Sequence, residues 1–548
     1  MTLRPILSAM AAAVALAFVT PSQAANPIAA ITPLWTFNHN VAPTIGRSSE
    51  ILLFDAATQA LWVTGGNGLD VLDLAGNRIQ TFTSTAFGSI NSLAISGNTL
   101  AVAFTNGTDA GLPGNVQFFD TTTFLSQGAN AALLGGVTVG AVPDMLTWTA
   151  DGNRLLVAIE GERQSDSNNP PGGVSLIDVS RTGNSLSTSV NTANFTAFDS
   201  QVASLRASGV RIVGNTLPSV AFEPEYIAIA PNGLTAQVTL QENNAIAELN
   251  LQTGQFTRIL PLGSKDFNAA GNAIDPSDRD NAVGIFRNIP VKGLYMPDAI
   301  VSYSAGGQAF FVMSNEGDAF VDDDDIVRLG NDAYVLDATA FPDAAVLKQD
   351  SNLGRLNVLR NGATGELATG TPATEIVTLG GRSFSIRDAD GNLVFDSGNQ
   401  LEVAALAAGV YADGRSDDKG VEPEGVAVFE LAGRTLAFIG LERTTRSAVA
   451  IYDITDPANS SFLQLLVSSD TSVLRPEGLA AFESNGRFFL AVGHESTVDN
   501  IIAGSGSNRT VLFEISPVPE PGTYALMLLG VLGVAAFARR SSSKATRA

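Results

Sequence analysis

The strongest constraint on the fold of this chain is a hairpin unit that recurs along it. Each clear copy begins with Pro and an acidic residue, runs through alternating apolar residues to a glycine-containing turn, and returns along a second apolar strand that ends on Glu. The five clear copies begin at Pro143, Pro224, Pro297, Pro423 and Pro476. Two weaker copies, at residues 49–74 and 91–120, keep the hairpin and a following strand but lack the Pro–acid start. Turns such as Asn-Gly and Asp-Gly are typical of tight β-hairpins.

The repeated hairpins predict an all-β fold. Seven units with three or four antiparallel strands each, at a period too irregular for a solenoid, favour a seven-bladed β-propeller with inserted loops. A β-sandwich is the more distant alternative because it needs fewer strands. Radial repetition hides strand edges, so an all-β chain of this length can stay soluble. We expect the propeller domain to span residues 25–517.

Three long insertions separate the repeated units. Residues 181–220 contain a predicted short helix, and residues 252–292 contain the polar, acidic stretch NAIDPSDRDN. The longest insertion, residues 338–421, contains an apolar hairpin that turns at Ala389-Asp390-Gly391. We interpret this hairpin as an addition to the blades.

The repeat also predicts that acidic residues gather on one face. In an antiparallel hairpin, the first residue of one strand lies beside the last residue of its partner. The predicted pairs are Asp144 with Glu160, Glu225 with Glu242, Asp298 with Glu316, Glu424 with Glu442, and Glu477 with Glu495. If the hairpins form the inner strands, these carboxylates ring the mouth of the central channel.

Clustered carboxylates stay ionised only when cations, basic side chains or hydrogen-bond donors offset their repulsion. Three interpretations follow. The carboxylates could cap the blades through backbone amides and nearby arginines. They could bind a hard cation, because sites made only of oxygen ligands suit Ca²⁺ or Mg²⁺. They could also form a metal-dependent catalytic site that orients a phosphate ester.

Basic residues close to this predicted mouth are the candidates for a catalytic role. Arg382, Arg415 and Lys419 lie in the longest insertion, just before a clear copy of the repeat. Guanidinium groups bind phosphate or carboxylate in a bidentate way, although salt bridges to the neighbouring acids are the simpler expectation. His494, directly before Glu495, is interpreted as a hydrogen-bonding neighbour rather than a general base.

Three other acidic segments resemble metal-binding loops less closely. The run from Asp322 to Asp325 is interpreted as a solvated loop. Residues 277–280 (SDRD) and 388–392 (DADGN) lack the later Glu that EF-hand spacing requires, so we expect turns there.

Composition excludes several classes of function. Cysteine is absent, so disulfides, cysteine-ligated metals and thiol nucleophiles are excluded, and the two histidines argue against a Ser/His/Asp hydrolase. The formal net charge is −23. Such an acidic surface repels nucleic acids and anionic lipids, so we expect no nucleic-acid partner.

The sequence predicts a targeting segment at each end of the chain. Residues 1–24 have one arginine, an apolar run and a small-x-small ending, which predicts a signal peptide cleaved after Ala24. A retained membrane anchor is the alternative, although the apolar run is short for a bilayer span.

The C-terminal segment, residues 518–548, has three parts. Pro519-Glu520-Pro521 precedes an apolar stretch at residues 524–538, and Arg539 and Arg540 follow at once. A short predicted transmembrane helix with a positive stop fits insertion with the arginines in the cytoplasm. This layout resembles the PEP-CTERM sorting signal. The resemblance implies export, transient anchoring in the inner membrane, cleavage by an exosortase, and display at the cell surface or outside the cell.

The body of the chain resembles the choice-of-anchor I family of secreted bacterial β-propellers. Stretches such as "EPEYIAIAPNGLTAQVTLQENNAIAELNL", "RSDDKGVEPEGVAV" and "GRSFSIRDADGNLVFDSG" carry the likeness, which runs from about residue 50 to 515. Relatives tend to have Asn-Glu at the end of the second strand. This chain keeps Asn315-Glu316 but has Ile159-Glu160 and His494-Glu495.

The resemblance implies the propeller more firmly than it implies an activity. We therefore expect a surface or matrix module that binds a ligand or acts as a scaffold, with divalent-cation sites and no organic cofactor. Its expected partners are the secretion machinery, an exosortase, and an extracellular polysaccharide or other surface ligand. Some relatives carry alkaline phosphatase-like or phytase-like labels, so a metal-dependent phosphoesterase is the alternative.

Overall fold

The computed structural model describes residues 26–44, 46–165, 167–320, 325–495 and 507–518. One compact unit, Ala30–Ser516, contains the sheets. The predicted signal peptide and the sorting signal, including the proposed membrane helix, lie outside the described residues.

Among the described residues, seven sheets have four antiparallel strands each. The first sheet consists of β2 (Leu52–Asp55), β3 (Ala60–Gly65), β4 (Gly68–Asp73) and β5 (Arg78–Thr83). The second consists of β6 (Ser89–Ser96), β7 (Thr99–Thr105), β8 (Pro113–Asp120) and β9 (Leu133–Ala141). The third consists of β10 (Pro143–Trp148), β11 (Arg154–Ile159), β12 (Gly173–Thr182) and β13 (Ser185–Asn194).

The fourth sheet consists of β14 (Pro224–Ile229), β15 (Thr235–Leu240), β16 (Ala245–Asn250) and β17 (Gln255–Pro261). The fifth consists of β20 (Ile300–Ala305), β21 (Gln308–Asn315), β25 (Ser383–Asp388) and β26 (Leu393–Asp396). The sixth consists of β27 (Pro423–Leu431), β28 (Arg434–Leu441), β29 (Ala448–Asp453) and β30 (Ser461–Val467).

The last sheet joins segments from the two ends of the chain. It consists of β31 (Pro476–Ser484), β32 (Arg487–His494), β33 (Arg509–Pro517) and β1 (Ile28–Asn38), in that order. Strand β1, the first of the described chain, therefore supplies the outer strand of a sheet whose other three members are the last.

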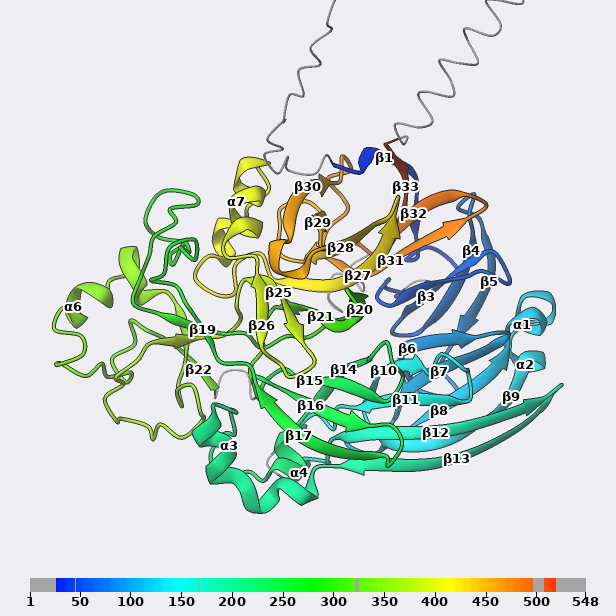
Figure 1. The fold of residues 1–548 in the computed structure, drawn as a ribbon, viewed down its shortest axis with the longest axis horizontal. Helices are drawn as coiled ribbons and strands as arrows, with labels where there is room; N and C mark the ends of the chain where they lie inside the picture. Colours follow the sequence, from blue (N-terminus) through cyan, green and yellow to red (C-terminus); the bar gives the residue numbers. More distant parts are fainter. Residues whose placement is uncertain (1–25, 45, 166, 321–324, 496–506, 519–548) are drawn as a thin grey trace, which may run out of the picture. The chain divides into compact units, whose positions relative to one another are not determined.

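The seven sheets close into a ring through their first strands (Figure 1). Strand β6 contacts β2 and β10, β14 contacts β10 and β20, β27 contacts β20 and β31, and β31 contacts β2. The first strand of each sheet is thus the innermost. The predicted all-β propeller is confirmed.

The insertions build a smaller structure beside the ring. Strands β18 (Ser264–Asp266), β19 (Lys292–Leu294) and β24 (Val377–Thr378) form one sheet, and β22 (Ile326–Arg328) pairs with β23 (Asn357–Leu359). A separate apolar cluster that includes Phe267, Leu353 and Val358 packs this region.

The hairpin around residues 389–391 is present, but it is not an addition to the blades. Its strands, β25 and β26, follow β21 in the fifth sheet and complete it. The sequence concealed this role because a long insertion, residues 316–382, separates β21 from its partner β25.

Helices are short and lie outside the sheets. They are α1 (Thr121–Gln127), α2 (Ala129–Ala132), α3 (Val202–Ser208), α4 (Pro218–Ala221), α6 (Ala344–Leu347) and α7 (Gln400–Ala407), with short turns η1 (Thr196–Gln201), η2 (Asp350–Gly354), η3 (Asp413–Arg415) and η4 (Pro457–Asn459). Helix α3 confirms the short helix predicted in the first insertion.

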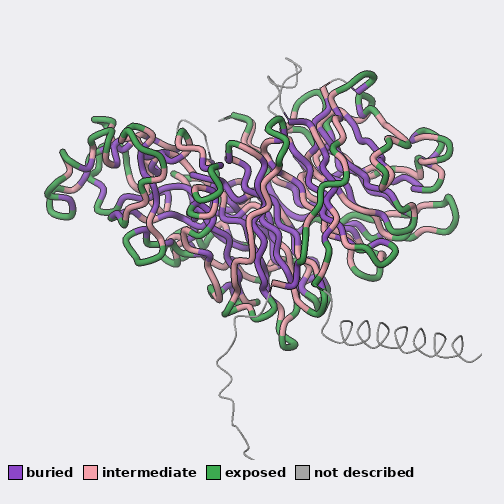
Figure 2. Tube along the Cα trace, turned by 90° about the horizontal axis from the view of Figure 1, so that it is seen from above, coloured by how far each residue is buried: buried purple, intermediate pink, exposed green. Residues whose placement is uncertain are grey.

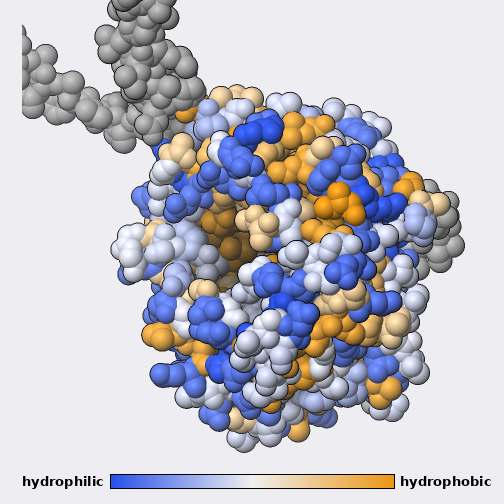
Figure 3. Space-filling view, turned by 90° about the vertical axis from the view of Figure 1, so that its right-hand side faces the viewer, coloured by the Kyte–Doolittle hydropathy of each residue, from blue (hydrophilic) through white to orange (hydrophobic). Residues whose placement is uncertain are grey.

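The middle strands of the sheets are the most buried, and exposed residues gather at the loops on the outside of the molecule (Figure 2). Every residue of β3 is buried, whereas the outer strand β13 is mostly exposed. Apolar side chains of neighbouring sheets pack together, and Leu156 of the third sheet and Val238 of the fourth belong to one buried cluster. On the face seen in Figure 3, hydrophilic and apolar side chains are mixed, and the surface is hollowed.

A buried polar network joins the two ends of the ring. His39 Nδ1 lies 2.8 Å from Asp70 Oδ2 in β4, and its Nε2 lies 2.9 Å from Thr510 Oγ1 in β33. Arg47 Nη1 donates to Asp70 Oδ1 at 2.7 Å. His39, Arg47 and Asp70 are all buried, so the charges of Arg47 and Asp70 have no solvent to replace a lost partner.

Candidate functional site

The acidic residues at the strand starts occupy one repeated backbone position. In each of four sheets, a bulge separates the initial Pro from the aliphatic residue three positions later, and the acid lies within that bulge. These acids are Asp144, Glu225, Glu424 and Glu477. A bulge turns a side chain out of the regular alternation of the strand. The repeat therefore aims each carboxylate at the channel.

The same position is occupied in the other three sheets. Asp298 and Glu50 stand two residues before the paired aliphatic residues Ile300 and Leu52. In the second sheet, the bulge between Ile90 and Ser92 contains Asn91 instead of an acid. All seven residues line one cavity, so they form an inner ring of six carboxylates and one amide.

Backbone strain precedes several members of this ring. Val142, Met296, Glu422 and Arg475 each directly precede the Pro of a clear repeat, and they have φ values of 47°, 45°, 46° and 60°. Residues with a Cβ rarely adopt this left-handed region. Strain of this kind persists only when the surrounding structure enforces it, and it is typical of functional sites.

A second set of side chains comes from the ends of the second strands. Glu316, Glu442 and Glu495 line the cavity, and Glu160 lies beside Asp144 and Glu225. In the fourth sheet, Leu240 pairs with Pro224, so the next residue, Gln241, occupies the position that Glu160 has in the third sheet. The predicted partner Glu242 is one residue further along and buried, and Gln241 lines the cavity instead.

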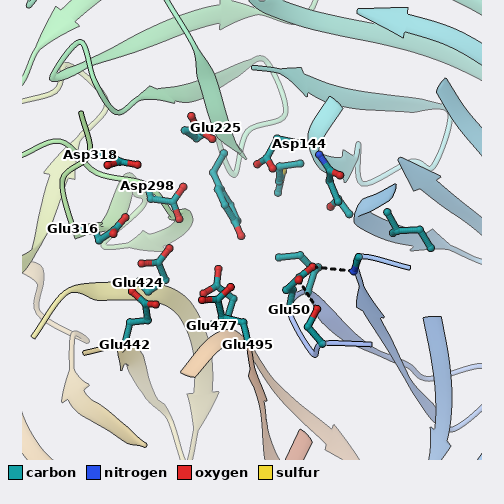
Figure 4. Close-up of a pocket in the computed structure, with 18 of the residues that line it drawn as sticks. Glu50, Asp144, Glu225, Asp298, Glu316, Asp318, Glu424, Glu442, Glu477 and Glu495 are labelled. Carbon is teal, nitrogen blue, oxygen red and sulfur yellow. Dashed lines mark hydrogen bonds between the residues drawn. The ribbon is translucent and has the colours of Figure 1, made fainter. Parts of the chain in front are cut away.

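The cavity, which we call the acidic cavity, has a volume of about 740 Å³. Figure 4 shows the carboxylates of the inner ring and of the second strands pointing into a common space from all sides. Asp318 and Tyr226 also line it. The predicted gathering of acids on one face is therefore present.

Within the described residues, three groups of acids could each hold a metal ion. They are Asp144, Glu160 and Glu225; Glu316, Glu424 and Glu442; and Glu442, Glu477 and Glu495. In each group, one oxygen from every carboxylate lies within 4.8 Å of the others. Oxygen-only groups of this kind match the preference of Ca²⁺ and Mg²⁺.

The electrostatics of the cavity oppose full ionisation of these acids. Burial, followed by the charge of Glu50, raises the pKa of Asp144 to about 7. Burial and neighbouring carboxylates likewise raise the pKa values of Glu225, Glu424 and Glu477 well above the ordinary range. Carboxylates in such surroundings bind either protons or cations.

Basic side chains neutralise one part of the cavity. Arg475 pairs with Glu442 and Glu495 at 2.8 and 3.1 Å. Arg443 also pairs with Glu442, at 3.0 Å, and Lys419 pairs with Glu316 at 2.6 Å. No ion pair with Asp144, Glu160 or Glu225 occurs within the described part of the chain.

The three predicted catalytic residues fall into two places. Arg382 is buried outside the cavity, where it pairs with Glu402 at 3.2 Å and donates to the backbone carbonyls of Ser416 and Asp418. Arg415 and Lys419 instead line a second cavity of about 300 Å³, together with Arg443. This second cavity shares Asp318 and Arg443 with the acidic cavity.

His494 has a structural position. Its Nδ1 lies 3.0 Å from the backbone carbonyl of Arg509 and its Nε2 lies 2.7 Å from Ser447 Oγ. Nδ1 therefore donates to the carbonyl, and Nε2 accepts from the serine. Burial lowers the pKa of His494 to about 4, so the ring is neutral at physiological pH.

The weaker acidic segments are explained without a metal. Asp325 is buried against Arg211, so its predicted solvated position is wrong, and the residues before it lie outside the described chain. Asp278 pairs with Arg355 at 2.8 Å. Asp388 accepts from backbone amides of its own turn, as expected.

Sequence reasoning missed Glu50, Asn91, Gln241 and Tyr226. A Pro precedes the acid in each clear copy of the repeat, whereas Glu50 follows Ser49 and Asn91 follows Ile90. Aligning each copy on the first buried aliphatic residue of the strand, such as Leu52 or Leu93, would have identified both positions. The basic partner Arg475 was missed because it precedes its repeat unit.

Fold and site together define a β-propeller with a carboxylate-lined central cavity. Residues 50–457 match the model of the choice-of-anchor I domain, and the chain belongs to this family. Residues 517–541 match the PEP-CTERM protein-sorting motif. The protein is thus an exported surface β-propeller that an exosortase sorts.

Other proteins are similar over different parts of the chain. Gigasin-3a of Magallana gigas is 26% identical over 204 residues, which cover 32% of this chain and 70% of that protein. Kuenenia stuttgartiensis hydrazine synthase covers 88% of this chain and 97% of its own, with 9% identity and a TM-score of 0.44. The Neurospora crassa Pan2 WD40 domain covers 89% and 97%, with 9% identity and a TM-score of 0.41.

No helix among the described residues is long and apolar enough to cross a bilayer. The predicted C-terminal membrane helix is not among these residues.

Proposed function

We propose that this surface propeller is a binding or scaffold module whose acidic cavity holds divalent cations, Ca²⁺ or Mg²⁺. The observation that supports the proposal is the convergence of carboxylates from separate sheets to within 4.8 Å in three groups. Each group offers several oxygen ligands at the spacing that a hard cation bridges.

The group formed by Asp144, Glu160 and Glu225 is the best candidate for the first cation. It lacks an ion pair to any described residue, whereas Arg443 and Arg475 already partner the groups that contain Glu442. Glu424 belongs to a second candidate group. Its Oε2 is buried without a hydrogen-bond partner in the described chain. A cation there would replace the missing donor.

Metal analysis and thermal melting of the mature protein test the proposal. We expect stoichiometric Ca²⁺ or Mg²⁺ after purification, a lower Tm in EDTA, and recovery when Ca²⁺ is added, since a ligand of the native state raises its stability. Asp144→Asn combined with Glu225→Gln should abolish most of the Ca²⁺-dependent shift. The exposed control Asp390→Asn should leave the shift unchanged. A Tm that is independent of EDTA and Ca²⁺ would refute the proposal.

A metal-dependent phosphoesterase is the second candidate. The observation that favours it is the contact between the acidic cavity and the second cavity, which brings Arg443 beside the carboxylates. Turnover of a phosphate monoester with Ca²⁺, Mg²⁺ or Mn²⁺ distinguishes the two functions. Activity that persists in Glu424→Gln combined with Glu442→Gln would place the chemistry outside this site.

A further inference from the structure

The second cavity brings three basic side chains to the edge of the acidic cavity. Arg415, Lys419 and Arg443 line it, and Arg443 belongs to both cavities. Glu422, whose side chain is fully buried, holds the three cations in place, with closest approaches of 2.5, 3.3 and 3.4 Å. The basic groups are therefore positioned before any ligand arrives.

The two arginines retain donors for a ligand. Arg415 uses Nε and Nη2 toward Glu422, and its Nη2 also pairs with Asp418 at 2.7 Å. Both ion pairs of Arg443 are closest at Nε. Within the described chain, Nη1 of Arg415 and both Nη atoms of Arg443 make no hydrogen bond. The two side chains are 35% and 31% exposed, so solvent or a ligand reaches these nitrogens.

We propose that Arg443 and Arg415 form an oxyanion subsite, and that its ligand is an acidic polysaccharide whose sugar carboxylates bind there. The fixed fork of a guanidinium group matches a carboxylate in a bidentate way. Because Arg443 also lines the acidic cavity, a second carboxylate of the same sugar chain can ligate a cation held there. This second contact rests on the proposed cation site, whereas the arginine contact does not.

The charge and size of the site favour a sugar carboxylate over a phosphate ester. Glu422, Asp418 and Asp318 line the second cavity beside the arginines, and their repulsion is smaller for a monoanion than for a dianion. The two cavities, of about 740 and 300 Å³, share lining residues and together exceed the needs of a single small ion. A chain of linked acidic sugars can extend from one cavity to the other.

Calorimetry with oligogalacturonate tests this inference on the mature protein in Ca²⁺ at about 1 mM, the affinity range of extracellular calcium modules. We expect saturable binding, which Arg443→Gln and Arg415→Gln each weaken by about tenfold or more, as the loss of a charge-assisted hydrogen bond predicts. Arg443→Lys should recover only part of the loss. Arg487→Gln, which removes an exposed ion pair with Glu514, is the matched control and should bind normally. Tm and circular dichroism verify that each variant is folded.

Several outcomes separate this inference from the proposed cation site. Binding of oligogalacturonate in EDTA that still depends on Arg443 supports the subsite even if Ca²⁺ does not bind. Ca²⁺ binding without oligogalacturonate binding refutes the subsite and leaves the cation site intact. Equal binding of a neutral oligosaccharide, or unchanged affinity in folded Arg443→Gln and Arg415→Gln, also refutes it. Competition by inorganic phosphate at lower concentration than galacturonate would instead assign the subsite to phosphate.

Discussion

Protons compete with the proposed cations for each carboxylate of the acidic cavity. Burial raises the pKa values of Asp144 and Glu442, which line the cavity, to about 7, and that of Glu242, which is buried one residue beyond Gln241, to about 8. These groups bind protons more tightly in the folded chain than in the unfolded chain. Their contribution to stability is therefore complete below the ordinary carboxyl pKa values of 3.8 to 4.5, and it is lost progressively as the pH rises from there through 7 to 8.

This linkage predicts a pH-dependent stability. In EDTA, we expect the Tm to fall between pH 6.5 and 8.5, and added Ca²⁺ should reduce the fall because the cation replaces the proton. The window begins at 6.5, the ordinary pKa of histidine, because the lowered pKa values of His39 and His494 have the opposite effect at more acidic pH. Differential scanning fluorimetry at several pH values measures the effect. A Tm in EDTA that stays level or rises over this window contradicts the assignment, and Asp144→Asn should flatten the profile.

Single residues also show where sequence reasoning reaches its limit. The nearly constant spacing between the two acids of each copy predicted Asp144, Glu424 and Glu477 in a shared cavity, because that spacing maps directly onto a hairpin. It misplaced the partner of Glu225 by one residue, because only the strand register distinguishes Gln241 from Glu242. Lys419, which precedes β27, pairs with Glu316, which follows β21. No local sequence pattern indicates this contact between two distant segments.

At the level of elements, the bulge at the start of five of the seven sheets turns the ring side chains toward the cavity. A regular strand would alternate its side chains between two faces. The left-handed residue, the Pro and the bulged acid together interrupt that alternation at the same place in the repeat. The repeat motif predicted the hairpins but not the bulges, because a bulge appears only in the pairing of two strands.

The buried network around His39 predicts a strong dependence of stability on one carboxylate. Asp70→Ala should lower the free energy of unfolding by about 3–5 kcal/mol, because it leaves Arg47 buried without its partner. Denaturant unfolding followed by fluorescence measures the change. The control Asp178→Ala removes an exposed ion pair with Arg154 and should cost less than about 1 kcal/mol. Similar losses in the two variants would show that the network does not hold the ring closed.

At the scale of the whole molecule, the sorting motif predicts the form that reaches the surface. In a host with an active exosortase, mass spectrometry of the mature protein should find residues 524–548 absent. Replacing Pro519, Glu520 and Pro521 by alanine should retain the tail in the membrane fraction, because the motif matched at residues 517–541 is then lost. Surface display of the alanine variant without its tail would contradict the role of the motif.

The overall architecture was largely predictable, since seven similar units imply radial repetition. The arrangement of the insertions was not, because β19 and β24 pair although a whole hairpin and a long insertion lie between them, and no repeat specifies that contact. The basic residues of the second cavity come from one of these insertions and from the ends of the blades. The repeat pattern in the sequence does not indicate that these basic residues lie close together in the fold.

The sheet shared by β1 and β33 determines when the ring of sheets can close during folding. Most of the other sheets consist of consecutive strands and can form as their own stretch of chain becomes available. The last sheet needs both β1, which is synthesised early, and β33, which is the final strand of the described chain. The ring can therefore close only after β33 is available to pair with the sheet that contains β1. Until β33 pairs with β1, the ring that gathers the carboxylates is open, so the proposed cation site would be complete only at that step.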